Sequence, residues 1–309
     1  MPSIEKKIIK NKPFFYLSEQ VRIAGKNKKI QVYVGRSIPN DLSLHYTRLS
    51  QKEREFIAQH EAAMFRPERT IQTDILQWLE DYRVLWKYAL AQKSPEEQER
   101  LWRRFLIAFI FESNAIEGSR LSQKEVESIV RKQYIKKSLG RKEILEVRNA
   151  IRAFEFIRSA QFQLNERSLI RLHALVTRGL GVQQGFKKRQ IIVNNKRTTP
   201  PGHVRASLSG LASWWRAEQK TKRHPLFFAA DFHSRFELIH PFEDGNGRVG
   251  RLLFVWMMMQ KGYPPLLFRY RNRRSYFGAL NQADEGRTQK WYWLCVRVYK
   301  DTARWLLTL

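Results

Sequence analysis

The chain has 309 residues, of which 43% are apolar, and its 57 Lys and Arg against 29 Asp and Glu give a formal charge of +28. This length allows one large domain or two ordinary ones, with a sizeable core rich in aromatic residues. The apolar runs are far shorter than the roughly 20 residues of a membrane-spanning helix, and the polar, lysine-rich start does not resemble a signal peptide. The single cysteine, Cys295, excludes an internal disulfide and is expected in the core. We therefore expect a soluble, cytoplasmic protein without membrane contact, whose charge attracts polyanions or acidic proteins.

Residues 1–48 predict a basic β-hairpin extension. Phe14–Ile23 and Lys29–Gly35 alternate apolar and polar residues, and Ala24–Asn27 between them is a turn signal. The dense lysine and arginine content would suit contact with a partner, although a solvated strand face is the commoner explanation.

Helical patterns dominate the rest, which we divide into a helical region at 49–140 and a second region at 141–309. Ser94-Pro95 starts one helix and Ser122–Glu125 forms a capping box for the next. Further helices are expected at about 141–160, 166–178, 206–219, 225–239 and 252–259, and the last helices run from about 274 to 307. Arg189–Thr199 interrupts them with a β-branched run and an Asn-Asn turn, which predicts a hairpin. The predicted fold class is mainly α with minor β.

Residues 240–251, HPFEDGNGRVGR, carry the features that phosphate chemistry needs. Gly245 and Gly247 allow close approach of phosphate oxygens at the start of a helix, where unpaired amide groups face the anion. Arg248 and Arg251 are three residues apart, so both can project from the first turn toward a polyphosphate. The spacing GxGxxG also occurs here, but a helical pattern precedes it, which argues against a dinucleotide-binding fold.

Two residues before the glycines suggest the remaining chemistry. Asp244 can help hold Mg²⁺ beside phosphate oxygens. His240 is largely neutral at pH 7 when its pKa is unperturbed, so it can accept a proton from an attacking hydroxyl.

The same twelve residues are similar, position for position, to the Fic-family signature HPFx[D/E]GNGRxxR, and the resemblance covers about residues 100–309. It implies a Fic-type helical bundle with a β-hairpin flap, and transfer of AMP from ATP to a Ser, Thr or Tyr hydroxyl of a target protein. The roles that the resemblance implies are general base for His240, Mg²⁺ ligand for Asp244, α- and β-phosphate binding for Gly245, Asn246 and Gly247, pyrophosphate contact for Arg248, and γ-phosphate contact for Arg251.

Ser113–Gly118 forms a second informative stretch, at the end of a helix expected at about 99–118. Gly118 suits a left-handed helix cap, and Glu117 then meets an unfavourable helix dipole. From these residues alone, an exposed and indifferent glutamate is an equally good explanation. The stretch is similar to the inhibitory motif [S/T]xxxE[G/N] of Fic proteins, with Ser113 at its first position. The resemblance implies that Glu117 pairs with Arg251 and blocks the γ-phosphate, and hydrolytic de-AMPylation stays open as a second activity.

The resemblance also implies target and adenine contacts. Arg189–Thr199 would be the flap, with Ile191, Ile192 and Val193 offering main-chain contacts to the target. Phe277 and Asp284 fall where relatives contact adenine, although Asp284 replaces an amide. Lys187 stands where the family often has arginine.

Rival functions remain open. The transferred group could be UMP, phosphocholine or phosphate, although kinases of the family usually carry Lys where Gly247 stands. A basic protein that binds nucleic acid is the alternative of another class, supported by the charge and by Arg269–Arg274. The sequence lacks a recognisable helix-turn-helix, zinc spacing and an aromatic nucleic-acid-binding run. The expected target is acidic or nucleic-acid-associated, and a homodimer through the N-terminal helices is left open.

Overall fold

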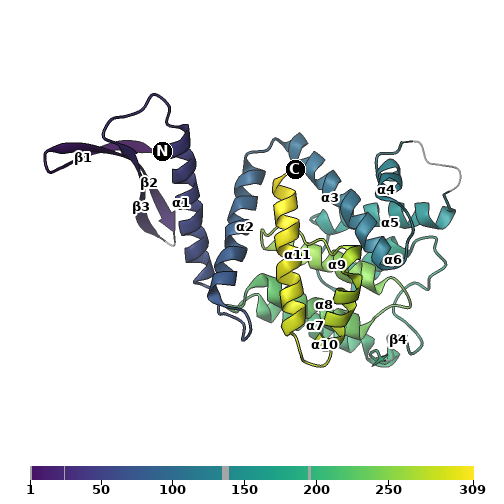
Figure 1. Cartoon of the computed structure of the whole chain (residues 1–309). Coiled ribbons are helices and arrows are strands. Elements are labelled where there is room, and N and C mark those ends of the chain that lie inside the picture. The colour runs from purple at the N-terminus through teal and green to yellow at the C-terminus, as the bar shows by residue number, and fades with distance from the viewer. Residues whose placement is uncertain (1, 24, 134–138, 194–195) are drawn as a thin grey trace. The chain divides into compact units, whose positions relative to one another are not determined.

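The computed structural model describes residues 2–23, 25–133, 139–193 and 196–309. The chain divides into two compact units, Met1–Leu85 and Trp86–Leu309, each of which has its own internal contacts (Figure 1). The three predicted regions, bounded at residues 48 and 140, stay a prediction.

The first unit contains an antiparallel sheet of strand order β1-β2-β3. Its strands are β1 (Ser3–Ile9), β2 (Lys12–Ile23) and β3 (Lys26–Gly35). The predicted hairpin is confirmed as β2 and β3, with Gly25 at a φ of 79° in the turn and Ala24 outside the described residues. Strand β1 was not predicted, because its lysines obscure the alternation of apolar residues. Helix α1 (Ser43–Ala62) packs on one face of the sheet, and together they bury Leu17, Val21, Ile30, Val32 and Leu49.

Helix α2 (Thr73–Ala91) includes the residues at which the two units divide, and the described residues of the second unit form helices and one short hairpin. Its helices are α3 (Pro95–Ile116), α4 (Gln123–Val130), α5 (Arg141–Arg158), α6 (Glu166–Thr177), α7 (Val204–Glu218), α8 (Pro225–Ile239), α9 (Asn246–Gln260), α10 (Arg273–Ala283) and α11 (Gln289–Leu307). The predicted mainly α class is therefore confirmed. None of the helices in the described residues is long and apolar enough to cross a membrane.

Local capping explains where α3 and α4 begin. The Ser94 side chain accepts a hydrogen bond from the Glu97 amide at 3.3 Å, and the Glu97 carboxylate accepts one from the Ser94 amide at 2.8 Å. Ser122 and Glu125 form the same reciprocal pair at the start of α4. Each pair satisfies amide groups that a helix start leaves unpaired, as the sequence predicts.

Helices α8 and α9 form the centre of the second unit, where they pack against each other. Helix α9 is buried on all sides from Val249 to Met258, as its continuous apolar run predicts. The surrounding core is aromatic, with Trp291 and Phe254 at 0–1% exposure, and Cys295 is fully buried. This rigid packing fixes the loop that joins α8 to α9.

Candidate functional site

The motif begins where α8 ends. The helix stops at Ile239, and His240 adopts the left-handed conformation with φ 48° and ψ 63°. The His240 amide still donates to the Phe236 carbonyl oxygen at 3.0 Å. Pro241 disfavours a helical conformation for the residue before it, so the helix cannot continue. A left-handed backbone is uncommon for a residue other than glycine, which indicates that the surrounding structure fixes how the imidazole is presented.

The loop between the helices is closed by its own asparagine. The Asn246 side chain accepts from the Phe242 amide and donates to the Phe242 carbonyl oxygen, both at 2.9 Å. The Phe242 ring is fully buried and stacks on His173, with centroids 3.9 Å apart. His173 in turn contacts the Asp244 carbonyl oxygen through Nε2 at 3.1 Å. Because the Asn246 side chain is already engaged, its contribution to phosphate binding would come from its backbone.

Two glycines shape the N-terminus of α9. Gly245 caps the helix with φ 82°, and a Cβ at this position would lie 3.1 Å from Thr177 Cγ2. Both the backbone conformation and the lack of space therefore require glycine here. A Cβ on Gly247 would lie 2.2 Å from Glu117 Oε1 and 3.0 Å from Arg251 Nη1. The bare backbone at the positive end of the helix is suited to receive an anion.

Arg251 is held from the opposite side by the end of α3. Its Nε donates to Ser113 Oγ at 2.9 Å and its Nη2 donates to the Ser113 carbonyl oxygen at 3.0 Å. The same Nη2 donates to Glu117 Oε1 at 2.7 Å. Arg251 is 2% exposed and Glu117 is 39% exposed, so the carboxylate lies at the edge of the site. Glu117 raises the pKa of Arg251 against the effect of burial, which keeps the guanidinium charged.

The cap after Glu117 matches the expectation from the sequence. Gly118 has a φ of 101°, and its amide donates to the Ala115 carbonyl oxygen at 3.0 Å. The helix therefore ends where Glu117 can turn toward Arg251.

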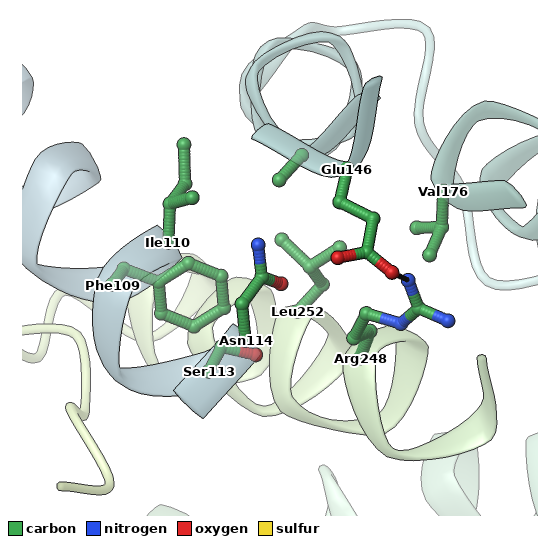
Figure 2. A pocket seen from close by; sticks show the side chains of 9 residues that line it. Phe109, Ile110, Ser113, Asn114, Glu146, Val176, Arg248 and Leu252 are labelled. Atoms are coloured by element: carbon green, nitrogen blue, oxygen red, sulfur yellow. Dashed lines mark ion pairs between the residues drawn. The ribbon is translucent and has the colours of Figure 1, made fainter. Parts of the chain in front are cut away.

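Arg248 has different partners from Arg251, although both lie in the first turns of α9. Its Nη1 lies 3.6 Å from Glu146 Oε1 on α5, and its Nη2 donates to Asp244 Oδ2 at 3.2 Å. Figure 2 shows Arg248 and Glu146 facing each other beside Ser113 and Asn114 of α3. The cavity there has a volume of about 10 Å³, close to the space that one water molecule needs. It is too small for a nucleotide and is a small gap between the packed helices α3, α5 and α9.

Lys187 is a residue of the site whose role the sequence did not indicate. It is 2% exposed, and its Nζ donates to Thr198 Oγ1 at 2.6 Å and to the Ile239 carbonyl oxygen at 3.1 Å. The lysine thus connects the base of the flap to the residue before His240. Burial lowers its pKa to about 8.

His240 is kept in its neutral form. Burial lowers its pKa to about 4, and the nearby Lys187 cation contributes to the shift. Its Nδ1 is buried and has no hydrogen-bond partner among the described residues. At neutral pH the imidazole is therefore uncharged and able to accept a proton.

A buried polar cluster lies behind Arg251, and sequence reasoning missed it. His233 Nε2 lies 2.7 Å from the Tyr276 hydroxyl and 3.9 Å from Glu237 Oε1. A Cβ on Gly250 would lie 2.5 Å from that Glu237 oxygen, so the cluster packs directly against α9. Burial raises the pKa of Glu237 to about 8. The spacing of His233 and Glu237, four residues apart on α8, was the available signal.

The flap and the expected adenine contacts lie at the other edge. Strands β4 (Ile192–Val193) and β5 (Lys196–Arg197) pair antiparallel, while the predicted turn residues Asn194 and Asn195 lie outside the described residues. The Ile191 carbonyl oxygen continues the pairing by accepting from the Thr198 amide at 3.2 Å.

The flap is tied to α10 and the turn after it. Lys196 Nζ lies 3.8 Å from Asp284 Oδ2 and donates to the Asn281 carbonyl oxygen at 2.9 Å. Burial raises the pKa of Asp284. Phe277 is half-buried, and Cζ of the Arg273 guanidinium lies over its ring, 4.9 Å from the ring centroid.

Asp244 is an exposed carboxylate of the loop, directly before the glycine that caps α9. Its side chain is 64% exposed, and Oδ1 accepts from the Gly245 amide at 2.6 Å. In the part of the chain that the structure describes, no three His, Cys, Asp or Glu side chains group as a metal site. A single exposed carboxylate fits Mg²⁺, which takes most of its ligands from phosphates and water.

Comparison with known proteins shows what part of the chain is similar to. Residues 163–258 match the Fic/DOC family. The chain is 29% identical over 194 residues to protein adenylyltransferase Fic of Culex quinquefasciatus, covering 61% of this chain and 39% of that protein. It is 31% identical over 189 residues to the protein of the same name from Nematostella vectensis, covering 57% and 43%. The chain thus spans about two fifths of the length of these relatives.

The fold is also similar to that of a solved structure, a Fic-domain-containing signaling protein from Bacteroides thetaiotaomicron. The TM-score is 0.68 at 20% identity, with 74% of this chain and 95% of that chain covered. Residues 163–258, which match the Fic/DOC family, include the whole of 240–251, from His240 with its left-handed backbone to the buried Arg251. Residues 163–258 are therefore similar to a Fic/DOC-family domain, and the fold is that of a solved Fic-domain protein.

Proposed function

We propose that this protein is an adenylyltransferase that moves AMP from ATP onto a Ser, Thr or Tyr hydroxyl of a target protein, under inhibition by Glu117. The observation that carries the proposal is the junction of α8 and α9. There a neutral, buried histidine directly precedes a glycine-capped helix N-terminus. An activated hydroxyl and a bound polyphosphate need those two features side by side.

In the proposed reaction, ATP lies with its phosphates at the N-terminus of α9. The target's hydroxyl oxygen forms a bond to the α-phosphorus while its proton passes to the His240 imidazole. The bond from the α-phosphorus to the bridging oxygen breaks, and pyrophosphate leaves. The backbone of residues 245–247 would hold the α- and β-phosphates, and Arg248 would face the departing pyrophosphate.

Asp244 is proposed to hold Mg²⁺ together with phosphate oxygens, since its carboxylate is exposed at the mouth of the loop. The ion would neutralise charge on the phosphates. Arg248 shares that carboxylate at 3.2 Å, so Asp244 also aligns the first turn of α9.

Glu117 is proposed to inhibit the enzyme by occupying Arg251. The guanidinium that would receive the γ-phosphate is already bonded to Glu117 and Ser113. ATP would then bind with its γ-phosphate away from Arg251, and its α-phosphate would be misaligned for the reaction. The end of α3 would have to move or be replaced for productive binding.

The target is proposed to be an acidic or nucleic-acid-associated protein that docks by strand addition to the flap. Ile192 is 61% exposed on β4, which is a short edge strand. Main-chain groups of Ile191, Ile192 and Val193 would align the segment that carries the hydroxyl. The charge of +28 would speed encounter with an acidic surface.

The test compares the wild-type chain with Glu117→Gly and His240→Ala, using ATP labelled at the α- or the γ-phosphate, with and without a cell lysate. We expect protein-bound label from α-labelled ATP alone, strongest in Glu117→Gly and absent in His240→Ala. Label from γ-labelled ATP would instead establish phosphate transfer. Loss of α-label from a pre-labelled target would establish hydrolysis of the AMP bond, and label in His240→Ala equal to wild type would refute the assigned base.

A further inference from the structure

The N-terminal sheet has one face that α1 covers and one face that it does not. Alternation along the strands places Leu17, Val21, Ile30 and Val32 toward α1. The opposite face, which we call the open face, carries the residues between them. Its central cross-strand pair is Tyr16 with Tyr33, and Lys7 of β1 pairs with Phe14 of β2 on the same face.

Three aromatic rings gather on the open face. The Tyr33 ring lies 6.0 Å from the ring of Phe14 and 5.5 Å from that of Tyr16, measured between centroids. Tyr33 is 46% exposed, and the other two rings are half-buried. Cross-strand contacts explain why the rings touch one another. Tyr33, at 46% exposure, keeps part of its ring surface accessible for stacking.

Two basic side chains lie over two of these rings. Lys7 Nζ lies 4.6 Å from the centroid of Tyr16, and Arg36 Cζ lies 5.8 Å from that of Phe14. Residues 1–36 hold nine Lys and Arg against two acidic residues. One of the two, Glu5, is ion-paired with Lys29 and accepts a hydrogen bond from Ser18 at 2.8 Å. Lys7 and Arg36 therefore place positive charge beside the rings, while the charge of Glu5 is already balanced by Lys29.

We infer that the open face of the β1–β3 sheet, formed by Phe14, Tyr16 and Tyr33 with Lys7 and Arg36, binds single-stranded nucleic acid. Accessible rings offer bases a surface to stack on, and the cations beside them meet the phosphates. Only a single strand presents unstacked bases to a sheet. An acidic protein surface would engage the cations but would offer the three rings no stacking partner. This site is separate from the phosphate-binding loop and does not depend on the proposed transfer reaction.

The experiment measures fluorescence anisotropy of a labelled oligo(dT) of about 15 nucleotides, within the site sizes known for single-strand binders. The full chain is compared with Tyr33→Ala and Tyr33→Phe. Tyr46→Ala is the matched control, because Tyr46 is 44% exposed on α1 of the same unit. We expect Tyr33→Ala to weaken binding about tenfold, since loss of one stacked base falls in that range. Tyr33→Phe and Tyr46→Ala should bind as wild type does.

The salt dependence of the binding affinity separates the contribution of the rings from that of the charges. Lys7→Gln should reduce the slope of log affinity against log salt by about 0.7, the value for one phosphate contact on a single strand. Tyr33→Ala should leave the slope unchanged. If Tyr33→Ala binds as tightly as wild type, the affinity comes from net charge alone and the inference is wrong. Displacement of the oligonucleotide by polyglutamate at equal charge concentration would overturn it in favour of an acidic protein.

A crosslinking measurement on the wild-type chain keeps the inference testable should Tyr33→Ala fail to fold. An oligonucleotide with bromodeoxyuridine should form its adduct on the peptide that contains Tyr16 or Tyr33, and adducts confined to other peptides would refute the site. Self-labelling from α-labelled ATP should be the same in Tyr33→Ala and wild type, because Tyr33 lies outside the phosphate-binding loop. The two proposals can therefore fail independently.

Discussion

Replacement of Glu117 by glutamine isolates the charge of the proposed inhibitory contact. Arg251 Nη2 donates to Glu117 Oε1 at 2.7 Å, while the two bonds to Ser113 do not involve the carboxylate. A glutamine oxygen can still accept from Arg251, so the variant preserves the shape of the site and removes one negative charge. Binding of a γ-phosphate to Arg251 then competes with a weaker hydrogen bond.

The expected size of the effect follows from the strength of these bonds. Arg251 keeps its charge in the variant, so its hydrogen bond to the introduced glutamine stays charge-assisted and only the ion-pair attraction is lost. An exposed ion pair contributes about 0.2–1 kcal/mol. Because Glu117 is 39% exposed but Arg251 only 2%, we take the upper end of that range, about 1 kcal/mol. With tenfold per 1.4 kcal/mol, the affinity for ATP should rise about fivefold. The affinity for ADP, which lacks the γ-phosphate, should stay the same.

Isothermal titration of ATP and ADP, in a His240→Ala background that prevents turnover, measures both affinities. Glu99→Gln is the matched control, since Glu99 is a 59% exposed carboxylate on the same helix. It should change neither affinity. Equal tightening for ATP and ADP would mean that Glu117 acts on the site as a whole. No tightening for either would show that Glu117 does not compete with the γ-phosphate.

Three further predictions concern groups packed around the loop. Lys187→Met should raise the pKa of His240 from about 4 while leaving it below the usual value, because burial is the larger cause; a titration of the imidazole by NMR measures the shift. Gly247→Ala should displace Glu117, since the new Cβ would lie 2.2 Å from Oε1, and its loss of thermal stability should be partly restored by adding Glu117→Gly, which a differential scanning experiment tests. Glu237→Gln should flatten part of the pH dependence of stability. The raised pKa of about 8 means that wild type loses stability as pH rises from about 4.5 to 8, whereas the variant does not, so the difference in unfolding free energy should grow over that window and level off above it. A constant difference across the window would show that Glu237 ionises normally.

The sequence by itself determined the elements whose causes lie within a few residues. The capping pairs at Ser94 and Ser122, the glycine-capped start of α9 and the hairpin of β2 and β3 all depend on local hydrogen bonds and backbone preferences. The motif at 240–251 was equally legible, because its residue types are spaced for one loop and one helix turn.

Contacts between distant segments needed the tertiary structure. Residues alone left Glu117 as an exposed carboxylate or a partner of Arg251, and only the resemblance favoured the pair that is seen across 134 positions. The roles of Lys187 and Glu237 were not predicted. Both roles depend on shifted pKa values, and these shifts arise from burial against other elements of the fold. Likewise, the aromatic cluster of the open face arises from strand register, which brings Tyr16 and Tyr33 together. Local sequence fixes backbone preferences over a turn or a strand, whereas burial and electrostatic neighbours are set by how the elements pack.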